Sequence, residues 1–83
     1  LCYNDIGDKG GKAIGDALRV NSALTSLHLS RDAIGVEGAK SIGEALKVNS
    51  VLTWLNLWFN PIGDGKAALR EIAKGRPLLT LAL

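Results

Sequence analysis

Residue types that form disulfides, metal sites and nucleophilic centres are almost absent from the sequence. It has one cysteine, Cys2, one histidine, His28, and no methionine. A single cysteine excludes an intrachain disulfide framework and fits a reducing compartment, so we expect a cytoplasmic protein. A lone cysteine and a lone histidine 26 residues apart provide neither a metal cluster nor a nucleophile–base pair. The sequence therefore predicts no enzyme, no bound metal and no cofactor.

Long apolar runs and concentrated charge are missing as well. No stretch approaches the roughly 18 uninterrupted apolar residues of a membrane span, and no signal peptide is recognisable. The 10 basic and 8 acidic residues are spread along the chain, whereas a nucleic-acid footprint needs a concentrated basic stripe. These absences argue against a membrane protein and leave nucleic acid only as a remote alternative partner.

The glycine-rich stretch GDKGGK at residues 7–12 is a candidate phosphate-binding loop that fails on spacing. It lacks the G-x-x-x-x-G-K-[ST] pattern, and Ala13 stands where a hydroxyl residue is needed. The related IGDGK at residues 62–66 falls in register with it. We therefore interpret both stretches as turns of an internal repeat.

The repeat is clearest in two segments of thirteen residues. ALRVNSALTSLHL at residues 17–29 recurs as ALKVNSVLTWLNL at residues 45–57, a shift of 28 residues with nine identical positions. LLTLAL at residues 78–83 follows after a shift of 26, which places Leu78 opposite Leu52. The repeat predicts a single domain, residues 1–83, of about three units. Because the chain begins at Leu1 and not at methionine, we expect a fragment of a larger repeat array.

Each unit combines two apolar periods. Leucines in the period of a strand mark its first part, as in Leu24, Leu27 and Leu29. Apolar residues in the 3.6-residue period of a helix mark its second part, as in Ala39, Ile42, Ala45 and Leu46. A unit of this size cannot bury its own apolar faces. We therefore expect stacked units in an α/β fold, with parallel strands on one face and helices on the other.

This pattern resembles the leucine-rich repeat. The motif L-x-x-L-x-L-x-x-N-x-I is read from Leu24 to Ile34 and again from Leu52 to Ile62. The 28-residue period with a full helix resembles the ribonuclease-inhibitor type. The phrase IGD…ALKVNS is similar to repeats of the cytoplasmic nucleotide-binding leucine-rich-repeat (NOD-like) receptors of innate immunity. The resemblance implies a right-handed solenoid, with parallel strands on the concave face and helices on the convex face.

Some positions depart from the family pattern or need their own interpretation. Asp32 replaces the asparagine of the turn, whose side chain satisfies buried backbone groups from unit to unit in the family. An ionised aspartate only accepts hydrogen bonds, which puts this ladder in doubt at the middle unit.

Gly15 and Gly43 lie inside helices, where each costs about 0.5–1 kcal/mol in helix propensity. We interpret them as sites of close packing, with a hinge as the alternative. Asp8 and Asp64 stand just before their helices, where we expect each to cap its own helix.

Residues between the buried leucines should point to the concave face. They stack in columns: Ser26, Trp54 and Thr80; His28, Asn56 and Ala82; Cys2, Ser30 and Trp58; Tyr3, Arg31 and Phe59. Exposed aromatics flanked by arginine and asparagine have the composition of an interface hot spot. The predicted partner-binding residues are Trp54, Trp58, Phe59, Asn56, His28, Arg31 and Tyr3. The alternatives are tryptophans partly buried against a neighbouring strand and Phe59 folded into the core.

The predicted function is recognition of a protein partner on the concave sheet face, within a larger receptor or regulator. The alternative is a structural repeat unit, natural or engineered, that assembles into a homo-oligomer through exposed terminal strands.

Overall fold

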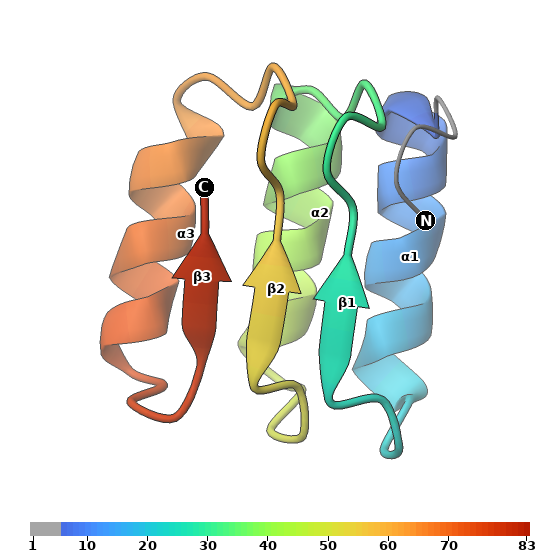
Figure 1. The fold of residues 1–83 in the computed structure, drawn as a ribbon. Helices are drawn as coiled ribbons and strands as arrows, with labels where there is room; N and C mark the ends of the chain where they lie inside the picture. Colours follow the sequence, from blue (N-terminus) through green and yellow to red (C-terminus); the bar gives the residue numbers. More distant parts are fainter. Residues whose placement is uncertain (1–5) are drawn as a thin grey trace.

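The computed structural model describes residues 6–83, in which helices and strands alternate in two layers (Figure 1). In chain order the elements are α1 (Gly7–Val20), β1 (Ser26–His28), α2 (Val36–Leu46), β2 (Trp54–Asn56), α3 (Gly65–Lys74) and β3 (Thr80–Ala82). The strands form one parallel sheet in the order β1-β2-β3, and the helices lie side by side behind it (Figure 1). The predicted α/β fold with a parallel sheet is confirmed.

Strand pairing follows the repeat. Leu27 pairs with Leu55, and Leu55 pairs with Leu81, so the steps along the sheet are 28 and then 26 residues. These central leucines point towards the helices, because successive side chains of a strand point to opposite faces. Leu55 is fully buried and meets Ile42 and Leu46 of α2 in one apolar core. Each such side chain stabilises the fold by about 1.5–3 kcal/mol.

The third unit corrects the predicted register at its first leucine. The period places Leu78 opposite the buried Leu52, but Leu78 is 83% exposed and Leu79 is 8% exposed. The N–H of Leu79 donates to the carbonyl of Arg76, 2.9 Å away, so a tight turn precedes the strand. This turn brings Leu79, and not Leu78, into the core. At the other edge of the sheet Leu24 is partly exposed, because among residues 6–83 β1 has a neighbouring strand on one side only.

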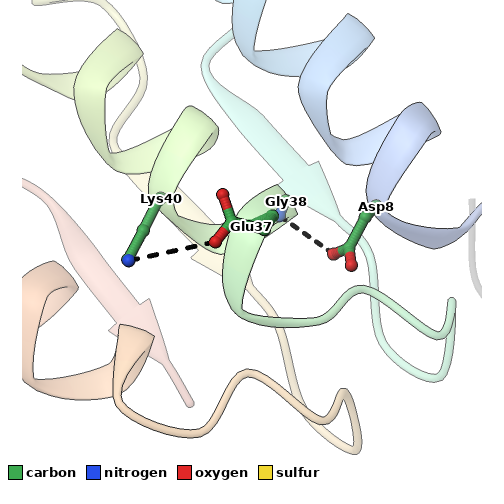
Figure 2. A network of polar contacts seen from close by, with 4 residues as sticks. All are labelled: Asp8, Glu37, Gly38 and Lys40. Atoms are coloured by element: carbon green, nitrogen blue, oxygen red, sulfur yellow. Dashed lines mark hydrogen bonds and ion pairs between the residues drawn. The ribbon is translucent and has the colours of Figure 1, made fainter.

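The first helix caps the second. Asp8 lies in the first turn of α1, and its Oδ1 accepts a hydrogen bond from the N–H of Gly38 in the first turn of α2, at 2.9 Å (Figure 2). The same oxygen accepts a second hydrogen bond from the N–H of Gly35, which directly precedes α2, at 2.7 Å. The expectation that Asp8 caps its own helix is therefore wrong, because its carboxylate faces the amides of the next unit. Asp64 directly precedes α3 but makes no side-chain cap hydrogen bond.

The helix ends are also joined from unit to unit. The Nδ2 of Asn49 donates to the carbonyl of Leu18 at the end of α1, at 2.8 Å. One unit later, the guanidinium of Arg76 donates to the carbonyls of Leu46 (3.1 Å) and Leu52 (2.7 Å). In the shortened third unit, Arg76 thus binds the carbonyl at the end of α2, as Asn49 binds the carbonyl at the end of α1.

Glycine brings α1 and α2 close together. A Cβ built on Gly15 would lie 2.7 Å from the carbonyl oxygen of Ser41, so α2 occupies the space of a side chain. A Cβ on Gly43 would instead meet side-chain carbons of Ile72 (3.1 Å) and Leu69 (3.4 Å) in α3. The close-packing interpretation of Gly15 and Gly43 is confirmed.

Candidate functional site

The sheet face opposite the helices carries two columns of side chains. In β1 and β2 the central residue is more buried than its neighbours, so the neighbours face away from the core. Cα pairing aligns Ser26, Trp54 and Thr80 in one column and His28, Asn56 and Ala82 in the other. These two of the four predicted columns are confirmed.

Trp54 lies against His28 on this face. Their ring centroids are 4.2 Å apart with an interplanar angle of 44°. His28 is exposed, whereas Trp54 is partly buried. The contact with His28 of β1 explains this partial burial, and it holds Trp54 beside the exposed imidazole.

A second aromatic group lies in the turn that follows β2. Trp58 is 51% exposed and Phe59 is 69% exposed, with ring centroids 6.4 Å apart in an edge-to-face arrangement. The guanidinium carbon of Arg31 lies 4.4 Å from the centroid of the Phe59 ring, within cation–π range. The alternative of Phe59 in the core is wrong, because Leu57 and Ile62 fill the core on either side of this turn.

The backbone of this turn makes Phe59 and Arg31 unusual choices. Phe59 has φ 59° and Arg31 has φ 58°, the left-handed region that favours glycine and asparagine. The two residues are 28 positions apart, so the turn imposes this conformation in both units. A residue with a side chain in this left-handed conformation costs about 1–2 kcal/mol of conformational free energy. Local folding therefore gives no reason for an aromatic ring and a guanidinium at these positions.

Two asparagines hold the backbone beneath the aromatic side chains. The Oδ1 of Asn56 accepts a hydrogen bond from the N–H of Trp58 at 2.9 Å. The Nδ2 of Asn60 donates to the carbonyl of Trp58 (3.2 Å) and to that of Leu29 in the neighbouring unit (2.6 Å). These hydrogen bonds therefore fix the backbone of the turn that carries Trp58. Asn56, predicted as a contact residue, also orients this turn.

The structure brings six of the seven predicted residues onto the sheet face and its adjoining turns. We call Trp54, Trp58, Phe59, Asn56, His28 and Arg31 the aromatic surface. Tyr3 lies outside the described residues. Periodicity did not single out Lys66, which lines an open hollow of about 420 Å³ together with Trp58, Phe59, Asn60 and Leu83. A lysine at a helical position is typical of a solvated face, and the sequence does not reveal the turn that lies beside Lys66.

A larger hollow, of about 570 Å³, lies between α2 and α3, and its charged groups are already paired. Lys47 contacts Glu44 at 3.1 Å, and Glu71 contacts Lys74 at 2.7 Å. Arg76 is bound to two backbone carbonyls. These partners leave the hollow with little capacity for recognising a ligand, so it is a weaker candidate than the aromatic surface.

Among residues 6–83, no group of three histidine, cysteine, aspartate or glutamate side chains is placed to hold a metal ion. In the same part of the chain, no helix combines the length and the apolar character needed to cross a membrane.

Comparison with known proteins supports the repeat interpretation. The family model described as Leucine Rich repeat matches residues 1–15 and 20–43. No curated protein matches the chain. The family match and the parallel sheet backed by helices support a leucine-rich repeat protein. Such repeats are commonly protein-interaction modules and are typically not enzymes.

Proposed function

We propose that this chain, as a leucine-rich repeat protein, recognises a protein partner through the aromatic surface, with Trp54 and Trp58 at its centre. The observation that carries the proposal is the exposure of aromatic rings at positions that the fold does not reserve for them. Ser26 and Thr80 pair with Trp54 in the same sheet, so strand pairing does not require an indole there. Large, rigid rings of this kind dominate binding energy at protein interfaces.

The proposal places the aromatic surface on the concave side of a right-handed solenoid. Strand–helix–strand connections between parallel strands are right-handed in nearly all proteins. Paired strands lie about 4.8 Å apart, whereas packed helices need about 8–10 Å, so stacked units curve with the sheet inside. We further propose that residues 1–83 are one domain of about three units within a larger cytoplasmic receptor or regulator. The similarity to ribonuclease-inhibitor-type and NOD-like receptor repeats supports this context.

The test combines an aromatic double variant with a matched control. Trp54→Ala with Trp58→Ala removes the two indoles, whereas Val20→Ala with Val48→Ala trims two valines, 85% and 61% exposed, away from the sheet face. Protein fragments displayed on phage are selected on the immobilised chain, and their affinities are measured by biolayer interferometry. We expect the tryptophan variant to lose at least about tenfold in affinity and the valine variant to lose almost none. Equal effects in two folded variants would refute the proposal.

Self-assembly through the terminal strands is the second candidate, and helix packing disfavours it. Small residues lie where α1 packs on α2, as Gly11 and Gly15 do, whereas α3 carries the long, exposed and charged side chains of Lys66 and Arg70. A second copy stacked on α3 would have to displace two charged side chains. Sedimentation velocity at rising concentration tests this: a homo-oligomer would overturn our ranking, and a monomer supports it.

A further inference from the structure

The central strand of the sheet carries two side chains whose surroundings are complete on both sides. Trp54 and Asn56 lie on the sheet face opposite the helices, and β2 is paired with β1 on one side and with β3 on the other (Figure 1). Both side chains are partly buried. Their accessibility is therefore set by strands that the structure describes and not by the edges of the sheet.

A hydrogen bond within the turn decides which end of the Asn56 amide is left for a partner. The backbone N–H of Trp58 is a donor, so it binds the Oδ1 of Asn56, at 2.9 Å, and not the Nδ2. Within residues 6–83, this Nδ2 donates to no acceptor. The indole N–H of Trp54 likewise donates to no group in the described part of the chain. One face of β2 therefore presents two unused donor groups, two residues apart.

Formal charge is absent from both columns of this face. The columns consist of Ser26, Trp54, Thr80, His28, Asn56 and Ala82. None of the six is a lysine, an arginine, an aspartate or a glutamate, so a charged partner group buried here would lose its hydration without gaining an ion pair. The matching chemistry is a neutral acceptor, of which the backbone carbonyl is the commonest in proteins. Helices and sheets already use their carbonyls, whereas an extended segment leaves them free.

We propose that Asn56 and Trp54 select an extended, uncharged segment of the partner by donating hydrogen bonds to its backbone carbonyls. The donors are the Nδ2 of Asn56 and the indole N–H of Trp54, and an apolar side chain of the segment packs on the indole ring. This inference rests on the proposed function and deepens it, because it names the chemistry of the partner and makes Asn56 a specificity-determining residue. An acidic segment accepts the same hydrogen bonds but would bury its charge without a counter-charge in either column.

Asn56→Asp removes the donor and preserves the hydrogen bond of the turn. Aspartate keeps an oxygen for the N–H of Trp58 and replaces the Nδ2 group by a negatively charged oxygen. Asn21→Asp is the matched control, because the Oδ1 of Asn21 also accepts from the N–H two residues later, that of Ala23, at 2.9 Å. Asn21 is exposed at the end of α1, away from the sheet face. Circular dichroism and urea unfolding verify that both variants fold.

Random twelve-residue peptides displayed on phage and selected on the immobilised chain supply the probes. The selected peptides are synthesised, and their affinities are measured by fluorescence anisotropy at low and high salt. We expect uncharged winners whose affinity changes little with salt. Asn56→Asp and Trp54→Ala should each weaken them at least about tenfold, and Asn21→Asp should leave them nearly unchanged. Alanine substitutions along each winner should not abolish the effect of Asn56→Asp, because they leave the backbone carbonyls in place.

The outcomes separate this inference from the proposed function. Winners that depend on Trp54 or Trp58 but tolerate Asn56→Asp, bind that variant more tightly or weaken equally with Asn21→Asp would overturn the donor role and leave the proposed function standing. Charged winners would overturn the uncharged segment. An effect of Asn56→Asp that disappears with one peptide side chain would overturn the backbone carbonyl as the acceptor. If no winner depends on Trp54 or Trp58, both proposals fail.

Discussion

Replacing Gly15 by alanine tests whether helix contact or helix propensity decides the stability of α1. The alanine Cβ would lie 2.7 Å from the carbonyl oxygen of Ser41 and 3.2 Å from the backbone nitrogen of Ile42. Backbone atoms of a packed helix cannot rotate away, so α1 and α2 must separate. Gly43→Ala is the matched control, because its Cβ meets only side-chain carbons that can adjust.

Two opposing free-energy terms set the size of the effect. Glycine to alanine inside a helix gains up to about 1 kcal/mol in propensity, and this gain is common to both variants. Overpacking against a rigid neighbour costs about 1–3 kcal/mol and applies mainly to Gly15→Ala. We therefore expect Gly15→Ala to lose up to about 2 kcal/mol of unfolding free energy, and Gly43→Ala to lie between neutral and about 1 kcal/mol more stable. For a chain of this size the total is about 4–12 kcal/mol, so the difference is measurable.

Urea unfolding, followed by far-ultraviolet circular dichroism and by tryptophan fluorescence, gives both free energies. Agreement between the two probes supports the two-state treatment that the comparison needs. The hinge alternative predicts that both alanines stabilise the fold to the same extent. Equal or greater stability of Gly15→Ala relative to Gly43→Ala would therefore refute the packing argument.

Three further substitutions test the contacts between units by the same urea experiment. Asp8→Ala removes the acceptor that caps α2 and should lower the free energy of unfolding by about 0.5–2 kcal/mol. Asp64→Ala removes no cap hydrogen bond and should be nearly neutral. Equal losses in the two variants would contradict the cap between units. Asn60→Ala leaves two buried backbone N–H groups without their acceptor. Each unsatisfied buried group costs about 1–3 kcal/mol, so the free energy of unfolding should fall by at least about 2 kcal/mol. A smaller loss would mean that water replaces the amide. Arg76→Ala frees two carbonyls at the end of α2 and the start of the next strand, and a loss below about 0.5 kcal/mol would show that its hydrogen bonds add nothing to the fold.

The repeat made most of the fold predictable. Leucines two residues apart and apolar residues 3–4 apart specify a strand and a helix within one unit, and the 28-residue shift aligns β1 with β2. The shift of 26 does not say where residues are missing, so the exchange of Leu78 for Leu79 was not predictable. Nor was the role of Asp8, because its distance from α2 depends on packing between helices and not on position along the chain.

The candidate site was predictable only as far as strand alternation extends. Trp54 lies within β2, and alternation placed it on the outer face correctly. Phe59 follows the strand, where alternation no longer applies and a left-handed turn sets its direction. Lys66 comes from a helix that follows the same turn, so its place beside Trp58 depends on how α3 packs. The part of the site that sequence could not predict is the part that joins two elements.

The hydrogen bonds around Trp58 separate the requirements of folding from those of binding. Asn56 and Asn60 bind the N–H and the carbonyl of Trp58, and neither bond uses the indole. The turn can therefore keep its conformation when the indole is removed, whereas removal of Asn60 releases the turn itself. Trp58→Ala should consequently change affinity without changing the unfolding free energy by more than about 0.5 kcal/mol, as is usual for exposed positions. A larger loss of stability would mean that the ring of Trp58 stabilises the fold, and its presence would then no longer argue that the aromatic surface is a binding site.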